Sequence, residues 1–302
     1  MFDKTILINK VINALQDNGY ETFVTHGSFD IVARQDRLIL IKTLMNIDSL
    51  EESHAMDLKA VSYFLSAHPF IVSIKNNREH LNDETVYSRF DVPVVTPKLM
   101  RVMLEDDELV VSHSSKGRHT QEINTFTLKE KRKELGYTLQ VLAKQIGISK
   151  KAMYEIEKKR VNPQRENAHA LERLLGTELA LPYEMKFEEP TYIRPKTVFQ
   201  KIVSREFARL GIDNSTVRSA PFEIIGRESF SIITNLSTTP SEIKKEIEEV
   251  RGLANVFSSK TVLISKRYVR TCVEGIPVVS EQELSELQSS KELSEIIDER
   301  TY

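Results

Sequence analysis

Residues 126–176 read FTLKEKRKELGYTLQVLAKQIGISKKAMYEIEKKRVNPQRENAHALERLLG, and their apolar residues recur at the spacing of helices that turn one face to a core. Thr138 and Ser149 stand where a side-chain oxygen can cap the second and third of these helices. Glycines end three of the segments, at Gly136, Gly147 and Gly176. The stretch is therefore expected to form four short helices, the last beginning at Asn162-Pro163.

The same stretch is a basic island in a nearly neutral chain. The 302 residues hold 42 Lys and Arg against 44 Asp and Glu, a net charge of −2. Residues 126–176 carry 12 basic and 6 acidic side chains, residues 1–125 carry 13 and 18, and residues 177–302 carry 17 and 20. A positive patch between acidic flanks favours a binder of phosphate backbones. The alternative is a helical bundle whose solvated basic face makes protein contacts.

The island resembles the helix-turn-helix of the phage-repressor (Cro-like, XRE) family. The shared residues are Thr138-Leu139-Gln140, Leu142-Ala143, Ile146-Gly147-Ile148-Ser149, Ile156-Glu157 and Asn162-Pro163. In that motif the third helix lies in the major groove with its N-terminal end toward the bases. The resemblance implies double-stranded DNA as the partner and residues 149–158 as the recognition helix. It also implies a homodimer that presents two such helices to a pseudo-palindrome.

The resemblance assigns DNA contacts position by position. It implies that Lys150, Lys151 and Tyr154 face the DNA, and either lysine could donate to O6 and N7 of guanine. Phosphate contacts are implied for Thr138 and Gln140 at the start of the second helix. Further backbone contacts, which raise affinity without reading sequence, are implied for Lys144, Lys158, Lys159, Arg160 and Asn162.

Three residues of the island fit the family pattern poorly. The Gln common at the start of the second helix is shifted here to Gln140, and Lys159 stands where a Gly is usual. Because lysine tolerates a positive φ poorly, Lys159 predicts a turn built differently. Glu155 would repel phosphates unless it points away or accepts from a cytosine amine.

The flank before the island, about residues 5–105, has the pattern of a mixed α/β domain. Helical segments are expected at residues 6–15, at about 51–66 and from Pro97. Short apolar runs predict strands near 23–24, 29–32, 38–41, 70–74 and 92–95. The resulting order is α-β-β-β-α-β-β.

The flank after the island, about residues 198–288, repeats this order. "SFDIVAR" (28–34) corresponds to "PFEIIGR" (221–227), and "LILIKTL" (38–44) to "FSIITNL" (230–236), with one residue fewer in the turn. "FIVSIK" (70–75) corresponds to "TVLISK" (261–266), and "VPVVTPKL" (92–99) to "IPVVSEQEL" (276–284). Four matches in the same order indicate two copies of one domain.

With Asp30 on one strand and Lys42 on the next, this order resembles the PD-(D/E)xK nuclease-like fold. Active members hold a metal with an Asp and a second acid two residues before the Lys, which here is Leu40. A leucine cannot bind Mg²⁺. The corresponding residues of the second copy are read as Glu223, Ile232 and Thr234. We therefore expect two inactive copies, an Asp30–Lys42 ion pair beside the sheet, and neither metal nor cofactor. The alternative is a metal-dependent DNA nuclease targeted by the helix-turn-helix.

The predicted architecture is multidomain: two nuclease-like α/β domains flank an all-α Cro-like bundle. The predicted segments are a degenerate nuclease-like domain (1–105), a β-hairpin connector (106–125), the helix-turn-helix domain (126–182), a linker (183–197) and the second nuclease-like domain (198–302). This arrangement resembles a family of archaeal proteins described as helix-turn-helix transcriptional regulators. The resemblance implies regulation of transcription. A separate alternative is that the flanks bind a small effector or a transcription-factor partner, with DNA binding as the output.

Several other classes of protein are not supported by the sequence. The one cysteine, Cys272, excludes an intrachain disulfide framework, and no secretory signal or run of 18 apolar residues occurs. The seven histidines lack metal-ligand spacing, and the glycine-rich nucleotide motifs and Gly-x-Ser-x-Gly are absent. We expect a cytoplasmic protein that has no membrane segment and is not an enzyme.

Overall fold

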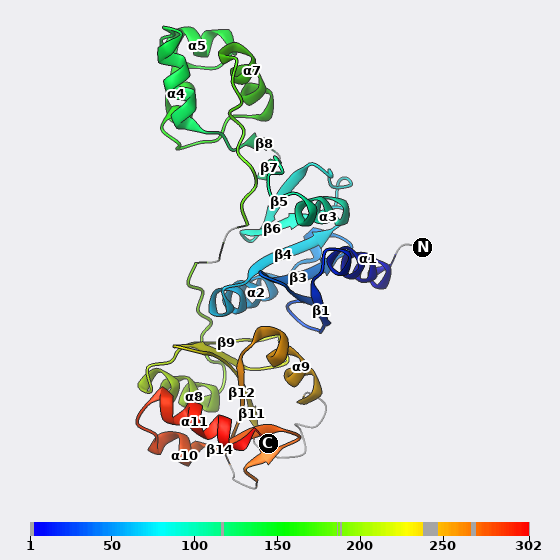
Figure 1. Cartoon of the computed structure of the whole chain (residues 1–302), viewed down its shortest axis with the longest axis vertical. Coiled ribbons are helices and arrows are strands. Elements are labelled where there is room, and N and C mark those ends of the chain that lie inside the picture. Colours follow the sequence, from blue (N-terminus) through cyan, green and yellow to red (C-terminus); the bar gives the residue numbers. More distant parts are fainter. Residues whose placement is uncertain are drawn as a thin grey trace. The chain divides into compact units, whose positions relative to one another are not determined.

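The structure, a computed structural model, describes residues 3–115, 118–185, 187, 189–237, 247–266 and 270–301. The chain forms two compact units (Figure 1). Unit 1 joins residues 1–79 to residues 185–302, and unit 2 comprises residues 80–184. Within the described ranges, no helix has the length and apolar character needed to span a membrane. The boundaries between the five segments predicted along the sequence stay a prediction.

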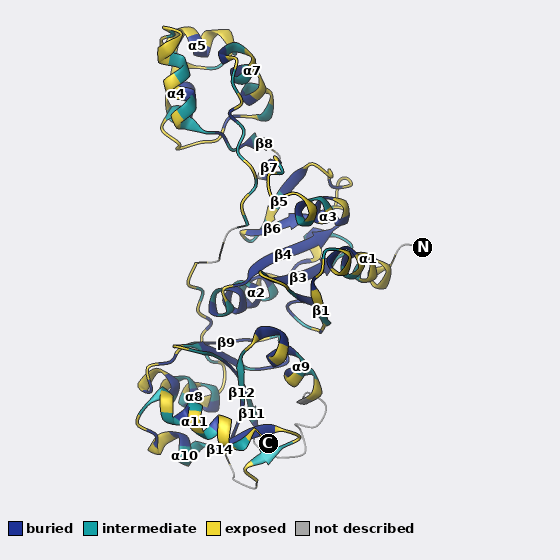
Figure 2. Cartoon of the chain, in the orientation of Figure 1, coloured by how far each residue is buried: buried dark blue, intermediate teal, exposed yellow. Residues whose placement is uncertain are grey.

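The first half of unit 1 is an α/β layer built on four strands. Its elements are α1 (Lys4–Asp17), β1 (Glu21–Val24), β2 (Ile31–Arg34), β3 (Leu38–Leu44), α2 (Glu52–Leu65) and β4 (His68–Ser73), with a short 3₁₀ turn, η1 (Ile47–Ser49). The strands lie side by side in the order β1-β2-β3-β4. Only β3 and β4 are parallel, because helix α2 carries the chain back between them. Both are buried apolar runs, as Figure 2 shows.

The second half of unit 1 repeats this sequence of elements. They are α8 (Val198–Arg209), β9 (Asp213–Thr216), β10 (Ile224–Arg227), β11 (Ser231–Ser237), α9 (Ile247–Phe257), β12 (Lys260–Ser265), β13 (Cys272–Val273), β14 (Ile276–Ser280), α10 (Glu281–Glu286) and α11 (Ser290–Arg300). The strand order is β13-β14-β12-β11-β10-β9, so β9 to β12 reproduce the order of β1 to β4. Helices α8, α10 and α11 share one apolar core with the sheet. The predicted repeat is confirmed.

The strand register corrects the alignment of the two copies by one residue. Arg34 pairs with Leu38 and Arg227 pairs with Ser231, so both turns hold three residues. The shorter turn predicted for the second copy is therefore wrong, and the two copies differ in length in the preceding loop, where residues 217–223 correspond to residues 25–30 and hold one residue more. Asn235, and not Thr234, therefore matches Lys42. A slip of one residue exchanges the two faces of a strand, which is why this error matters for the site.

Unit 2 contains three further elements of the nuclease-like pattern, a hairpin and four helices. They are β5 (Thr85–Arg89), β6 (Val92–Val95), α3 (Pro97–Glu105), β7 (Ser112–Ser115), β8 (Arg118–Gln121), α4 (Thr125–Glu134), α5 (Leu139–Gln145), α6 (Lys150–Glu157) and α7 (Arg165–Leu175). Strand β5 was absent from the predicted order, and β7 pairs with it in parallel. The predicted hairpin is present as β7 and β8, and its turn residues Lys116 and Gly117 lie outside the described residues.

The last helix of the island begins later than predicted. Residues 161–164 lie outside the helix, and the chain pairs with β8 at Gln164 before it turns into α7 at Arg165. The Gln121 amide donates to the Pro163 carbonyl at 2.9 Å, and Thr120 bridges Gln164. This pairing holds Asn162 and Pro163 in a loop, so the helix start predicted there is wrong.

Candidate nucleic-acid interface and nuclease-like centre

Helices α4 to α7 form the scaffold that presents the candidate DNA-binding residues. Buried side chains from all four helices, including Leu128, Leu142, Met153 and Leu171, make one apolar core. The predicted caps are in place. The Thr138 hydroxyl accepts from the Val141 amide at 3.2 Å and the Ser149 hydroxyl from the Ala152 amide at 3.1 Å. The capped ends fix where α5 and α6 begin, and therefore which residues lie in their first turns.

A buried ion pair holds α4 against α6. The Arg132 guanidinium donates from Nε and Nη2 to both carboxylate oxygens of Glu157, at 2.7 and 2.8 Å, and from Nη1 to the Tyr137 carbonyl at 2.8 Å. The two side chains are 12 and 9% exposed. The hydrogen bonds that Arg132 donates to Glu157 raise the pKa of Arg132 above its ordinary value, against the effect of burial.

The turn after α6 is left-handed at Lys159, where φ is +56°. Its amide donates to the Ile156 carbonyl at 2.9 Å, and the Arg160 amide donates to the Glu155 carbonyl at 2.9 Å. These are the bonds that normally close a helix on a C-terminal glycine. The prediction of a differently built turn is therefore wrong: the lysine adopts the backbone conformation that usually needs glycine.

The ten residues predicted to contact DNA are all exposed. They are Thr138, Gln140, Lys144, Lys150, Lys151, Tyr154, Lys158, Lys159, Arg160 and Asn162. Lys150 and Lys151 form the first turn of α6, while Met153 and Ile156 on the same helix are buried. Within the part of the chain that the structure describes, Lys144, Lys150 and Lys151 make no ion pair. Their ammonium groups are therefore available to an external anion, and the DNA contacts stay a prediction.

The C-terminal end of α6 holds its charges more tightly. Arg160 lies 3.3 Å from the Glu155 carboxylate, and its guanidinium stands over the Tyr154 ring at 5.9 Å. Nζ of Lys158 also lies over the Tyr154 ring, 5.8 Å from its centroid. Glu155, which would repel phosphates if it stood alone, is therefore partly neutralised by Arg160. Lys159 has a distant acidic neighbour, Glu122, at 3.9 Å.

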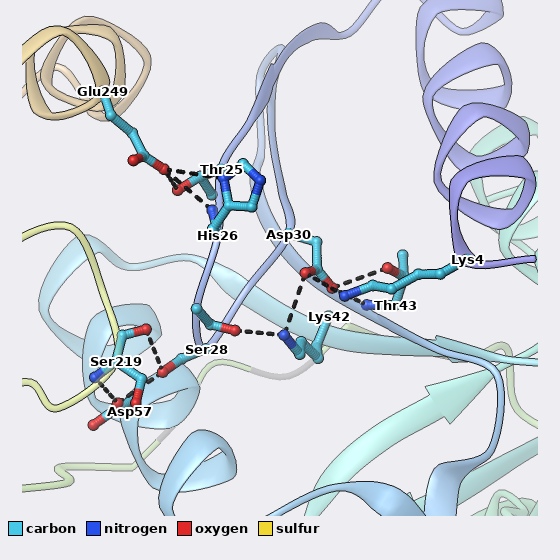
Figure 3. Close-up of polar contacts among 11 residues, drawn as sticks. Lys4, Thr25, His26, Ser28, Asp30, Lys42, Thr43, Asp57, Ser219 and Glu249 are labelled. Atoms are coloured by element: carbon cyan, nitrogen blue, oxygen red, sulfur yellow. Dashed lines mark hydrogen bonds and ion pairs between the residues drawn. The ribbon is translucent and has the colours of Figure 1, made fainter. Parts of the chain in front are cut away.

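The nuclease-like centre of the first copy is a closed hydrogen-bond cluster around Asp30 (Figure 3). Oδ1 accepts from Nζ of Lys4 at 2.8 Å and of Lys42 at 3.2 Å. Oδ2 accepts from the Thr43 amide at 2.7 Å and the Thr43 hydroxyl at 2.9 Å. Lys42 also donates to the Gly27 carbonyl. The predicted ion pair between Asp30 and Lys42 is confirmed.

Burial and charge act in opposite directions on this pair. Burial alone would raise the pKa of Asp30, but the hydrogen bond from Lys4, the charge of Lys42 and the Thr43 amide together hold it below its ordinary value. Burial lowers the pKa of Lys42, and the attraction of Asp30 only partly opposes this. The carboxylate is therefore kept ionised by protein donors that already occupy both of its oxygens.

The residues present do not fit the metal site of an active nuclease. Leu40, at the second acid position, is fully buried. In the second copy the corrected register places Ile233, also fully buried, at this position. Mg²⁺ binding needs several oxygen ligands, and Asp30 offers none that is unused. Among the described residues no group of three His, Cys, Asp or Glu side chains could hold a metal ion.

The second copy keeps the hydrogen bonds of the centre and has Asn235 where the first copy has Lys42. Glu223 accepts from the Leu236 amide at 2.9 Å, as Asp30 does from Thr43. The Asn235 amide donates to the Pro221 carbonyl at 2.7 Å, which replaces the donation of Lys42 to a carbonyl of the preceding loop. The predicted match of Ile232 and Thr234 to the catalytic positions is wrong by one residue, for the reason given by the strand register.

Comparison with known families assigns both kinds of domain. Residues 4–110 match the model of the PD-(D/E)XK superfamily domain, and residues 128–181 match the model named Helix-turn-helix. These matches confirm the predicted fold class, a nuclease-like α/β domain combined with a helix-turn-helix bundle.

Several archaeal proteins are similar to the chain over nearly their full length. The chain is 27% identical over 311 residues to a protein of Methanobrevibacter smithii, with 99% of both chains covered. It is 29% identical to a protein of Thermococcus kodakarensis, covering 97% of this chain and 95% of that one, and 28% identical to a protein of Methanocaldococcus jannaschii, covering 98 and 97%. All three bear the name "Putative HTH-type transcriptional regulatory protein". The predicted resemblance to archaeal regulators is confirmed. No solved structure is significantly similar to the chain.

Proposed function

We propose that this protein is a sequence-specific, double-stranded DNA-binding regulator of transcription that places α6 in the major groove. The observation that carries the proposal is the first turn of α6, where Lys150 and Lys151 are exposed while Met153 and Ile156 anchor the helix in the core. A rigid helix with two available ammonium groups at its N-terminal end suits guanine recognition. The names of the full-length relatives support the regulatory role.

The remaining contacts of the proposed interface are backbone contacts. Exposed cations and polar groups around α6 would neutralise phosphates and fix the register of the helix on the duplex. They are Thr138, Gln140, Lys144, Tyr154, Lys158, Lys159, Arg160 and Asn162. Affinity should therefore fall linearly with salt on logarithmic scales, with a slope set by the number of phosphates neutralised.

The test compares specific with unspecific binding in matched variants of the full-length protein. A preferred duplex is first selected from a random DNA library by the wild-type protein. The double variant Lys150→Ala/Lys151→Ala should then lose its preference over an unrelated duplex, because each base contact contributes about 1–3 kcal/mol of discrimination. Lys129→Ala/Lys133→Ala removes the same charge from exposed positions of α4 and should keep the preference. An unchanged preference in the first variant would overturn the proposal.

We also propose that neither α/β copy cleaves DNA. The support is the donor set: Asp30 is saturated by protein donors, and Leu40 and Ile233 replace the second acid. Incubation of the full-length protein with supercoiled plasmid and Mg²⁺ or Mn²⁺ tests this directly. Nicking that disappears in the Asp30→Ala variant would establish the nuclease alternative instead.

A further inference from the structure

The contacts between the two α/β copies of unit 1 are reciprocal. Helix α2 of the first copy packs on β10 of the second, and α9 of the second copy packs on β1 and β2 of the first. Arg34 donates to the Val256 carbonyl in the last turn of α9 at 2.7 Å. Arg227, its register equivalent, donates to the Tyr63 carbonyl in the last turn of α2 at 3.1 Å. Contacts that exchange equivalent surfaces are the mark of an isologous, twofold interface.

Two equivalent carboxylates secure this interface from opposite sides. Asp57 on α2 is fully buried and accepts from the amides of Arg218 and Ser219, at 3.0 and 2.8 Å. Glu249 on α9 accepts from the His26 amide at 3.1 Å and the Thr25 hydroxyl at 2.5 Å. In each case a helix of one copy binds the loop between the first two strands of the other (Figure 3).

The loop of the first copy, residues 25–30, is shaped for close backbone contact. Gly27 has φ +110°, and a Cβ there would lie only 2.0 Å from the Ser219 carbonyl oxygen. The Ser28 amide donates to that oxygen at 2.5 Å, and the Ser28 hydroxyl lies 2.7 Å from Asp57. A side chain at position 27 would therefore push Ser219 of the second copy away from loop 25–30.

The nuclease-like centre holds loop 25–30 in the conformation that contacts Ser219. Lys42 donates to the Gly27 carbonyl, and the Thr25 amide donates to the Asp30 carbonyl at 3.0 Å. Lys42 is only 8% exposed and is itself held by Asp30. Asp30, at the metal-binding Asp position of the fold, and Lys42, at its lysine position, thus set the conformation of loop 25–30, which contacts Ser219.

We propose that Lys4, Asp30 and Lys42 are positioning residues for an interaction surface, loop 25–30, whose partner is the second α/β copy of the same chain. The two copies form an intramolecular pseudo-dimer with Asp57 and Glu249 as its paired anchors. This inference does not depend on DNA binding. It assigns a present use to a centre that no longer fits a metal.

Hydrogen exchange of backbone amides in the full-length protein, followed by mass spectrometry, tests the inference. Lys42→Met removes the donor to Gly27 and should speed exchange at least about tenfold in two places together, at residues 26–28 and at Arg218 and Ser219 of the other copy. Strand β12 and unit 2 should keep their rates. Lys10→Met, an exposed lysine of α1, is the matched control and should change neither place.

Faster exchange confined to residues 26–28, with Arg218 and Ser219 unchanged, would overturn the proposal. Three milder variants keep the test decisive if Lys42→Met does not fold. Asp30→Asn preserves the shape of the cluster and should again loosen residues 218 and 219. Asp57→Asn should loosen the same two amides from the anchor side, while Glu249→Gln should loosen residues 25 and 26. Failure of Asp30→Asn to reach the second copy contradicts the inference even where the anchor variants do.

Discussion

At Lys159 a single side chain serves two opposing requirements. The left-handed turn after α6 needs φ of +56°, a conformation that costs an L-residue about 1–2 kcal/mol. The sequence nonetheless has a cation there, next to the predicted recognition helix. Lys159→Gly should therefore raise the free energy of unfolding by about 0.5–1 kcal/mol in urea titrations, after the greater entropy of an unfolded glycine is subtracted.

The same variant should bind DNA less tightly, with a salt slope shallower by about one unit if Lys159 contacts a phosphate. Lys158→Gly is the control, because Lys158 has φ of −86° and gains nothing from glycine. That variant should lose stability. A Lys159→Gly protein that is less stable than the wild type would contradict the argument from φ.

The Arg132–Glu157 pair is the polar contact on which the placement of α6 depends most. Removing one partner leaves a buried charge without compensation, which typically costs 3–5 kcal/mol. Arg132→Met should therefore lower the free energy of unfolding by about 3 kcal/mol. Lys131→Met breaks an exposed pair with Glu134, 2.8 Å apart, and should cost less than about 1 kcal/mol. Similar losses in the two variants, measured by urea unfolding, would show that burial of the first pair is unimportant.

Among the elements, apolar periodicity predicted most of what the structure contains. The capped helices at Thr138 and Ser149 and the parallel strands of both copies follow from local pattern, because each bears its hydrophobic face or run in the sequence. Strand register does not. The match of "LILIKTL" to "FSIITNL" maximised apolar overlap, yet the extra residue lies one loop earlier. Strand β5 was missed since only Thr85 and Val86 of its five residues are buried.

Near the C-terminal end of α7, the carboxylate of Glu172 accepts hydrogen bonds from two backbone amides, and we expect this contact to make the stability of the helical bundle depend on pH. Glu172 accepts from the amides of Leu179 and Ala180, both at 2.9 Å. Burial would raise its pKa, but these amides and His169 outweigh that effect and hold the pKa below the ordinary value of 4.5. A depressed pKa gives stability that is complete above the unfolded value and is lost as the pH falls through the folded one.

Glu172→Gln should therefore cost about 2 kcal/mol at pH 7, and the difference from the wild type should shrink as the pH drops below 4.5. Urea unfolding at several pH values between 7 and 3 measures it. Glu166→Gln, an exposed residue of the same helix, is the control and should give nearly parallel curves. If the difference in free energy of unfolding between Glu172→Gln and the wild type does not change with pH, ionisation of Glu172 is not the cause of its stabilising effect.

At the scale of the whole molecule, the functional residues that the sequence did not predict are those whose partners lie far away in the sequence. The exposed lysines Lys150 and Lys151 were predictable since a local motif and a local charge excess coincide at residues 126–176. Asp57 and Glu249 were not, because their partners are about 160 and 220 residues distant. An acid on the apolar side of helix 52–65 was the available signal: its burial requires donors that the helix itself cannot supply.

The organisation of the whole chain also determines how the protein could bind a palindromic DNA site. Each chain carries one helix-turn-helix, and its two α/β copies are engaged with each other, so a second recognition helix must come from a second chain. Two helices joined in a dimer should require half-sites about 34 Å, or one DNA turn, apart.

Inserting five base pairs between selected half-sites should weaken binding about a hundredfold, and inserting ten should restore part of it, because avidity is lost only when geometry forbids simultaneous contact. Fluorescence anisotropy on such duplexes, with Lys150→Ala/Lys151→Ala as the negative control, measures this. Equal affinity for one half-site and for two, in a protein that sediments as a monomer, would refute the dimer and leave a single major-groove contact as the unit of recognition.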